Sequence, residues 1–302
     1  MLTQEKFAPA VSPVTTDLIS IIIPAYNEEA AIGQDLRSIF ETMDASGYNY
    51  EVIVVDDGST DKTAEVVREF ERAKLVQHAR NRGTGAATNT AIRHARGEIV
   101  VMTDGDGTYP VRDIPRLLEH ILDYDMVVGA RTKETGTLRL LRTPAKWFIR
   151  MLASYLTETK IPDLNSGLRA FHKSLALKFM HLLPKGHSWV STITLAHLAD
   201  DYLVKYVPID YYPRKGKSSW SPIGDTYNYL LLVIRTVMYF NPMKVLFPIG
   251  FLLFAAGAIR QLWWFSIGNL HVLSSNVILV LAGMNILMMG LLADLIVRRA
   301  RQ

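Results

Sequence analysis

Two long apolar segments near the end of this 302-residue chain place the strongest constraint on its fold. Residues 245–267 contain one charged residue, Arg260, and residues 272–297 contain only Asp294. Each segment is long enough to cross a hydrocarbon core of about 30 Å. Because only the short turn 268–271 separates them, they predict a two-helix transmembrane hairpin.

The charges that flank the hairpin predict its orientation. Lys244 precedes it, and the sequence after it contains Arg298, Arg299 and Arg301. The positive-inside rule therefore predicts that both termini and the rest of the chain are cytosolic. Residues 1–17 lack a signal-peptide pattern and are expected to form a loose arm.

Composition excludes several classes of site. The chain has no cysteine, which excludes disulfides, zinc–thiolate sites and thiol nucleophiles. Its net charge of +4 is too small and too scattered to indicate nucleic-acid binding. Apart from His187, the histidines show no metal-ligand spacing and are expected at the surface.

Short β-branched runs alternate with helix-like segments before residue 131. The runs are 18–24, 50–55, 75–78, 99–103 and 125–130, and the intervening helical patterns include 63–72, 86–94 and 114–122. This alternation predicts an α/β fold with a doubly wound, mostly parallel sheet. We expect this α/β domain to span 18–218, before a juxtamembrane helix at 219–243 and the hairpin at 244–302.

Acidic clusters follow two of the predicted strands. Asp56-Asp57 closes one strand and Asp104-Gly105-Asp106 follows another. Ligands of open α/β sheets bind beyond the carboxyl ends of the strands. The D-x-D spacing lets two carboxylates reach one Mg²⁺ or Mn²⁺ ion and, through it, a diphosphate. The alternatives are helix capping for the first pair and a plain surface turn for the second.

Two stretches have the composition of membrane-surface helices. Residues 138–155 carry four cations on one helical face and an aromatic, apolar surface on the other, and residues 219–243 interleave aromatic residues with Leu and Val. Such amphipathic helices lie in the membrane interface. The alternative for 138–155 is a helix packed on the sheet.

Seven elements occur in order along the chain: P-A-Y-N-E-E (24–29), V-D-D-G-S-T-D (55–61), N-R-G-T-G-A (81–86), D-G-D-G-T-Y-P (104–110), V-G-A-R (128–131), N-S-G-L-R-A (165–170) and R-K-G-K-S-S (214–219). Together they resemble family 2 glycosyltransferases of GT-A type. Within that family they are most similar to dolichol-phosphate mannose synthase and its bacterial polyprenyl-phosphate relatives. One departure is Thr108, where many of these relatives carry Gln.

The resemblance implies a nucleoside diphosphate sugar, with UDP or GDP, as donor. The residues expected to bind it are Pro24, Tyr26, Glu28, Asp56, Asp57, Gly83, Asp104, Gly105, Asp106, Arg214 and Lys217. A divalent Mg²⁺ or Mn²⁺ would be held by Asp104 and Asp106. For Arg214 and Lys217, a generic juxtamembrane basic patch is the alternative.

The implied acceptor is a polyprenyl phosphate, which is already an anion at pH 7 and needs cations more than a strong base. Arg131, Arg169 and Lys215 are the expected phosphate ligands. Asp163 occupies the place where the family carries an acid near the anomeric carbon, so we expect it, with Asp104, Asp106 and Arg131, to act in catalysis. Capping of the following turn is the alternative for Asp163.

These inferences predict an inverting sugar transfer that gives a polyprenyl-phosphate monosaccharide at a membrane. The alternatives are a polysaccharide or glycolipid synthase with a hydroxyl acceptor, and a catalytically silent scaffold that binds nucleotide sugar. The sequence leaves open the sugar, the nucleotide and the oligomeric state, a homo-oligomer included.

Overall fold

The computed structural model describes residues 17–132, 151–155, 157–186, 188–213, 231 and 233–300. The chain divides into two compact units. The first comprises Met1–Arg139, Pro162–His197 and Tyr202–Trp220, and the second comprises Leu140–Ile161, Leu198–Asp201 and Ser221–Gln302. Three predicted segments lie wholly or mostly outside the described residues: the arm 1–17 apart from Asp17, most of the helix 138–155 and most of the stretch 219–243.

A seven-stranded sheet forms the centre of the first unit. Its strands are β1 (Ile19–Ala25), β2 (Tyr50–Asp56), β3 (Ala73–Gln77), β4 (Ile99–Met102), β5 (Met126–Arg131), β6 (Arg169–His172) and β7 (Val204–Ile209), in the order β3-β2-β1-β4-β6-β5-β7. All neighbours pair in parallel except β6, which is antiparallel to both β4 and β5. The predicted α/β fold with a mostly parallel sheet is confirmed.

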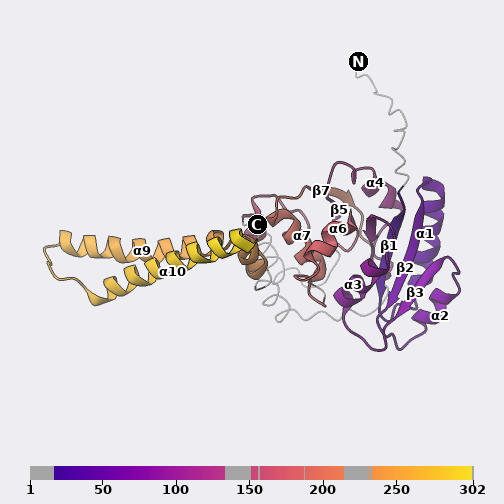
Figure 1. Ribbon diagram of the computed structural model, residues 1–302, viewed down its shortest axis with the longest axis horizontal. Helices are drawn as coiled ribbons and strands as arrows, with labels where there is room; N and C mark the ends of the chain where they lie inside the picture. The colour runs from indigo at the N-terminus through magenta and orange to yellow at the C-terminus, as the bar shows by residue number, and fades with distance from the viewer. Residues whose placement is uncertain are drawn as a thin grey trace, which may run out of the picture. The chain divides into compact units, whose positions relative to one another are not determined.

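Helices cover both faces of this sheet, because its strands are apolar on both sides. Along β1, Ile19, Ile21 and Ile23 face the core formed with α1 (Ile32–Ser46), α2 (Thr63–Arg68), the 3₁₀ turn η1 (Val111–Asp113) and α4 (Ile114–Leu118). Ile22 faces the core formed with α3 (Thr84–His94), α6 (Lys173–Phe179) and α7 (Trp189–Ala199). Figure 1 shows α1 and α3 on opposite sides of β1 and β2.

Strand register brings three functional segments to one edge of the sheet. Ala25 at the end of β1 pairs with Asp56 at the end of β2, and Ile22 pairs with Met102 at the end of β4. The first strand-to-helix turn, the Asp56-Asp57 pair and the D-x-D loop therefore begin at neighbouring carboxyl ends. This is where an open α/β sheet binds its ligands.

The second unit contains the two long apolar helices, α9 (Pro242–Ser266) and α10 (Ser274–Ala300). Residues Pro242–Ser266 and Ser274–Val297 are long and apolar enough to cross a membrane. Close packing of α9 on α10 occurs at glycines: a Cβ at Gly257 would lie 2.9 Å from the carbonyl oxygen of Asn276, and one at Gly283 would lie 2.5 Å from the amide nitrogen of Phe254. The predicted hairpin of apolar helices is confirmed.

Candidate active site

The turns that follow β1 and β2 are tied together by hydrogen bonds. The Asn27 amide donates to Ser59 Oγ at 2.9 Å, and the Thr60 amide donates to Asn27 Oδ1 at 2.8 Å. The Glu28 amide donates to Thr63 Oγ1 at 2.8 Å. These contacts place the two turns side by side, so the P-A-Y-N-E-E and V-D-D-G-S-T-D elements form one surface at the sheet edge.

Residues expected to hold the donor base differ in exposure across that surface. Tyr26 is 42% exposed, so its ring is available to a planar ligand. Pro24 is buried within β1, and Glu28 is buried beside the turn. Of the three residues, Tyr26 is the one whose side chain reaches solvent; the donor-binding role of all three stays a prediction.

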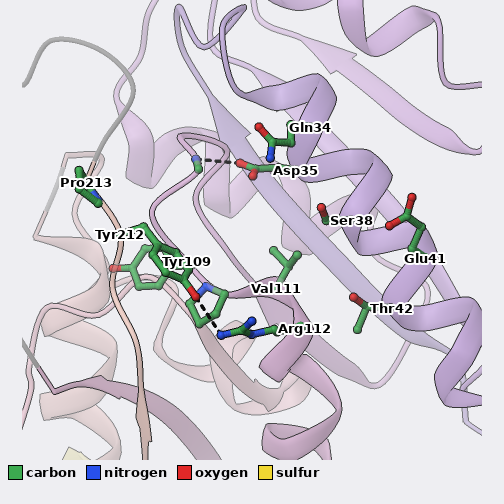
Figure 2. A pocket seen from close by; sticks show the side chains of 12 residues that line it. Gln34, Asp35, Ser38, Glu41, Thr42, Tyr109, Val111, Arg112, Tyr212 and Pro213 are labelled. Atoms are coloured by element: carbon green, nitrogen blue, oxygen red, sulfur yellow. Dashed lines mark hydrogen bonds between the residues drawn. The ribbon is translucent and has the colours of Figure 1, made fainter.

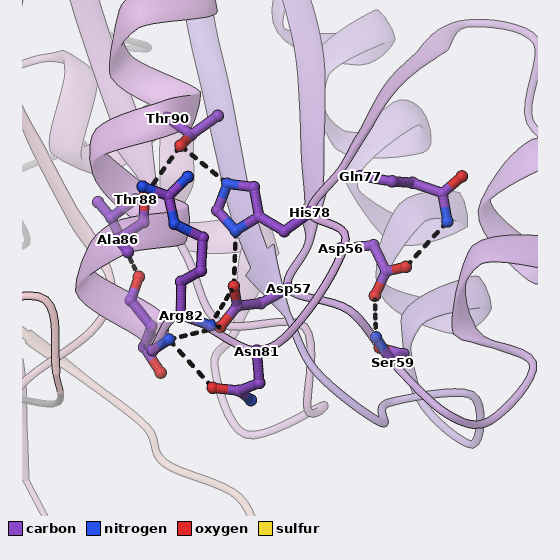
Figure 3. Close-up of polar contacts among 12 residues, drawn as sticks. Asp56, Asp57, Ser59, Gln77, His78, Asn81, Arg82, Ala86, Thr88 and Thr90 are labelled. Carbon is purple, nitrogen blue, oxygen red and sulfur yellow. Dashed lines mark hydrogen bonds and ion pairs between the residues drawn. The ribbon is translucent and has the colours of Figure 1, made fainter.

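The Asp57 carboxylate is the centre of a buried polar network (Figure 3). It accepts hydrogen bonds from the backbone amides of Arg82 and Gly83, at 3.0 Å and 2.7 Å. His78 Nδ1 lies 2.6 Å from Asp57 Oδ1, and the other ring nitrogen lies 2.9 Å from Thr90 Oγ1. Asp57 is only 2% exposed. Its contacts with His78, Arg82 and Gly83 hold the loop after β3 in place.

The structure bears on two expectations here, the surface position of the histidines and the role of Asp56. The expectation that His78 lies at the surface is wrong, because its side chain is 6% exposed; His197 is likewise buried. Asp56 accepts hydrogen bonds from the Ser59 amide and from Gln77, so it caps the turn after β2. Asp56 thus caps this turn and does not cap a helix, since α2 has no side-chain cap hydrogen bond, and the contact of Asp56 with a donor stays a prediction.

Gly83 lies where the loop meets another backbone segment. It has a φ of +94°, and a Cβ there would lie 2.5 Å from the carbonyl oxygen of Lys185. The chain's own backbone therefore already explains the need for glycine at this position. A contact between Gly83 and the donor remains a prediction.

The D-x-D loop after β4 is held by its own residues and by α1. Asp106 is buried, and its Oδ1 accepts hydrogen bonds from the amide and hydroxyl of Thr108, at 3.1 Å and 2.6 Å. The Gly107 amide donates to Asp35 Oδ2 at 2.9 Å. Gly105 packs on Ile32, whose Cδ1 would lie 2.7 Å from an added Cβ. The Thr108 hydroxyl thus orients the Asp106 carboxylate.

The donor set of this loop fits a hard divalent cation that shares its shell with a ligand. Among the residues that the structure describes, no group of three or more His, Cys, Asp or Glu side chains could hold a metal. Asp104 and Asp106 would therefore supply at most two carboxylates. Mg²⁺ is commonly bound in this way, through one or two carboxylates with phosphates and waters completing the shell.

The Asp104 carboxylate packs directly against the loop before β6. A Cβ at Gly167 would lie 2.5 Å from Asp104 Oδ2. The Gly167 amide in turn donates to the hydroxyl of Tyr109 at 2.7 Å. Burial, with the negative charge of Asp104, raises the pKa of Tyr109 above its usual range, so the phenol stays protonated at neutral pH.

Arg131 and Asp163 form a bidentate ion pair at the end of β5. Arg131 Nε donates to Asp163 Oδ2 at 2.7 Å, and Nη2 donates to Oδ1 at 2.9 Å. The two side chains are 14% and 9% exposed. Burial alone would raise the pKa of Asp163, but the hydrogen bonds and charge of Arg131 outweigh it and hold that pKa below its usual range. Asp163 is therefore a poor proton acceptor at neutral pH.

Arg169 lies in the interior. It is fully buried, and its guanidinium donates to the carbonyl oxygens of Val190 and Ser166 and to Thr194 Oγ1. Burial lowers the pKa of Arg169 to about 10, so it remains a cation at neutral pH. This placement argues against the expected contact with an acceptor phosphate. Arg214, Lys215 and Lys217 lie outside the described residues.

A groove of about 680 Å³ lies between α1 and the segment that follows the D-x-D loop (Figure 2). Its lining includes Gly107 and Tyr109 but neither Asp104 nor Asp106. Asp35 forms part of its wall and accepts the hydrogen bond from Gly107. The groove therefore borders the D-x-D loop from the α1 side, and neither carboxylate of that loop lines it.

Three residues in or next to the site were not identified from sequence. Tyr109 and Gly167 both belong to elements quoted for the resemblance, but nothing in either element indicates that they contact each other. His78 ends the third predicted strand and has no sequence signal of its partnership with Asp57. These contacts join segments far apart in the chain, which local patterns do not report.

Two family models match the chain: Glycosyl transferase family 2 over residues 20–179, and the GtrB C-terminal hairpin over residues 241–298. The chain is 26% identical to dodecaprenyl-phosphate galacturonate synthase of Rhizobium johnstonii, over 98% of this chain and 92% of the relative. It is 32% identical to dolichyl-phosphate hexose transferase of Haloferax volcanii, over 70% and 90% of the two chains.

Solved structures with the same fold include glucosyl-3-phosphoglycerate synthase from Mycobacterium tuberculosis. Its complex with phosphoglyceric acid is 25% identical, with a TM-score of 0.56 over 74% of this chain and 79% of that one. Its complex with Mn²⁺, UDP and glucosyl-3-phosphoglycerate is 24% identical, with the same TM-score and the same coverage of both chains. The second likeness bears on the fold alone.

Proposed function

The chain belongs to glycosyltransferase family 2, and on that premise we propose that it transfers a sugar from a nucleoside diphosphate sugar to a polyprenyl phosphate. The observation that carries the proposal is the apolar hairpin, which matches the GtrB C-terminal hairpin and is joined to a glycosyltransferase sheet. The two relatives named above are a dodecaprenyl-phosphate and a dolichyl-phosphate enzyme. A lipid acceptor explains why the enzyme is anchored in a membrane.

The reaction we propose is a single displacement with inversion. A phosphate oxygen of the acceptor forms a bond to the anomeric carbon while the bond from that carbon to the donor diphosphate breaks. The bonding electron pair leaves on the nucleoside diphosphate. Because the attacking oxygen already carries negative charge at pH 7, the step needs positioning more than deprotonation.

A divalent cation, held by Asp104 and Asp106, would neutralise charge on the departing diphosphate. The support for this is the buried Asp106 carboxylate oriented by Thr108 and the Asp104 carboxylate beside it in the same loop. Tyr26, exposed at the neighbouring turn, offers its ring to the donor base.

The state of Asp163 supports a phosphate acceptor over a sugar hydroxyl. A hydroxyl acceptor wants a carboxylate free to take its proton. Asp163 is instead bound on both oxygens, and Arg131 holds its pKa low. Arg131, at the carboxyl end of β5, is the described cation that we assign to the acceptor phosphate.

We further propose that the catalytic unit faces the cytosol. Lys244 lies in the first turn of α9, and Arg298, Arg299 and Arg301 follow the apolar part of the hairpin, so positive charge flanks the hairpin on the side of both termini. Donor nucleotide sugars and the enzyme would then share one compartment.

The test is product formation by membranes that contain the full chain, supplied with undecaprenyl phosphate, Mn²⁺ and a panel of radiolabelled UDP- and GDP-sugars. We expect one donor to give a labelled, acid-labile lipid. Asp106→Asn should lower the formation of this lipid at least about 100-fold, because the metal would no longer be held where it neutralises charge on the departing diphosphate. The matched control, Asp44→Asn, alters an exposed carboxylate and should leave the rate unchanged. Transfer only to an added glycan would contradict the proposal.

A further inference from the structure

We propose that the loop 163–167 is a brace that positions both charged partners of the reaction. Asp163 at its start holds Arg131, the cation assigned to the acceptor phosphate. Gly167 at its end limits the position of the Asp104 carboxylate. The inference rests on the proposed function and assigns Asp163 and Gly167 as positioning residues. It replaces the expectation that Asp163 acts as a base.

The Asp163 end is saturated with hydrogen bonds. Its Oδ2 accepts from Nε and from the backbone amide of Arg131, at 2.7 Å and 3.2 Å. Its Oδ1 accepts from Nη2 of Arg131 and from the amide of Asn165, at 2.9 Å and 3.0 Å. A carboxylate with both oxygens engaged in this way orients a guanidinium and is badly placed to accept a proton.

The pairing leaves one edge of Arg131 for a ligand. Asp163 occupies Nε and Nη2, while among the described residues Nη1 donates to no protein acceptor. The Tyr211 ring supports the guanidinium, with its centroid 5.1 Å from Cζ. A fixed guanidinium with a free edge suits a phosphate oxygen, because little side-chain entropy remains to be lost on binding.

The Gly167 end meets the metal-binding loop. The absence of a side chain at Gly167 lets its backbone touch the Asp104 carboxylate, since an added Cβ would lie 2.5 Å from Oδ2 and 2.9 Å from Cγ. The Gly167 amide is anchored on the Tyr109 hydroxyl at 2.7 Å. The position of the backbone at Gly167 therefore limits where the Asp104 carboxylate can lie.

Contacts within the unit hold the brace itself. Asn165 Oδ1 accepts from Ser191 Oγ at 2.7 Å, and the Ser166 carbonyl accepts from the buried Arg169. The rings of Tyr109 and Tyr211 meet edge to face, 5.3 Å apart. Tyr109, which holds Gly167, is thus in contact with Tyr211, which packs on Arg131. The two ends of the loop are therefore linked through these two rings.

The acceptor end is tested with Asp163→Asn, assayed with undecaprenyl phosphate and whichever labelled nucleotide sugar the wild-type enzyme uses. We expect KM for the lipid to rise about 10-fold with kcat largely kept, because a misplaced cation weakens binding. The pH–rate profile should keep its shape. A loss of kcat of about 100-fold or more, with loss of the acidic limb of that profile, would show that Asp163 is a base and would overturn the inference.

A matched control exists for this variant. Arg72 and Asp44 also form a bidentate pair, in which Nη1 and Nη2 donate at 2.8 Å and 2.7 Å, but this pair is exposed. Asp44→Asn removes the same chemical contact outside the site. It should leave KM and kcat at wild-type values, which would assign the effect of Asp163→Asn to its position.

The metal end is tested by measuring Mn²⁺ binding to the full chain in detergent, with UDP or GDP present. Electron paramagnetic resonance of Mn²⁺ is the readout. Gly167→Ala should weaken Mn²⁺ binding about 10-fold, because its Cβ displaces Asp104. Gly186→Ala is the matched control, since a Cβ there would meet nothing within 4 Å. Tyr109→Phe removes the anchor without adding bulk and should weaken binding in the same direction. Wild-type Mn²⁺ affinity in both Gly167→Ala and Tyr109→Phe would overturn the inference.

The two proposals fail in different ways. If wild-type membranes make no labelled polyprenyl lipid from any donor in the panel but do glycosylate an added glycan, the proposed function fails. If wild-type membranes make the lipid while Asp163→Asn behaves as a base variant, the function stands and the brace fails.

Discussion

At the scale of single residues, buried carboxylates hold the loops of this site in place through hydrogen bonds. Asp57 fixes the loop after β3 by accepting from two backbone amides and contacting His78. Asp57→Asn should lower the stability of the folded protein by about 3 kcal/mol, because an amide replaces one oxygen with a donor facing other donors. Thermal melting of the purified protein would measure this. The exposed Asp44→Asn should melt near the wild-type temperature, and equal melting of all three proteins would contradict the prediction.

The lowered pKa of Asp163 predicts how the stability of the folded protein depends on pH. Its pKa in the folded protein lies below the unfolded value of about 3.9, so the stability it contributes is complete above that pH and is lost as the pH falls through the folded pKa. The difference in melting temperature between wild type and Asp163→Asn should be constant from neutral pH down to about pH 5 and shrink below about pH 4. A difference that grows on acidification would contradict this sign.

At the scale of elements, the hairpin depends on close contact between α9 and α10. Gly257 faces α10, whereas its neighbour Ala256 is exposed. Gly257→Ile should destabilise the hairpin by about 1–3 kcal/mol, because the helices must separate to admit the side chain. Ala256→Ile adds a similar bulk on the outer side and should be neutral. Melting of the two variants in one detergent compares them directly, and equal melting would argue against the contact.

At the scale of the whole molecule, the proposed topology places the turn between α9 and α10 on the far side of the membrane from the catalytic unit. The chain has no native cysteine, so single cysteines report position without background. In intact cells, a membrane-impermeant maleimide should label Leu270→Cys in the turn and should label Glu71→Cys only after lysis. Labelling of Glu71→Cys before lysis would reverse the orientation.

The sequence alone determined the features that depend on residues close together in the chain. Strand and helix periods predicted the α/β sheet and hydropathy predicted the hairpin, and the structure confirms both. The metal site at Asp104 and Asp106 stays a prediction from their spacing. Each of these is a local pattern, because periodicity and hydropathy act over a few turns or one strand.

Only the tertiary structure decided how the site is assembled. Arg131 meets Asp163 across 32 residues, and Gly167 meets Tyr109 across 58 residues. The insertion of the antiparallel β6 between β4 and β5 places the loop 163–167 against Asp104 and carries Arg169 into the core. Such contacts follow from strand order and packing, which no local pattern encodes. The residues of the chain thus indicated the chemistry, while the sheet topology decided which of these residues contact one another.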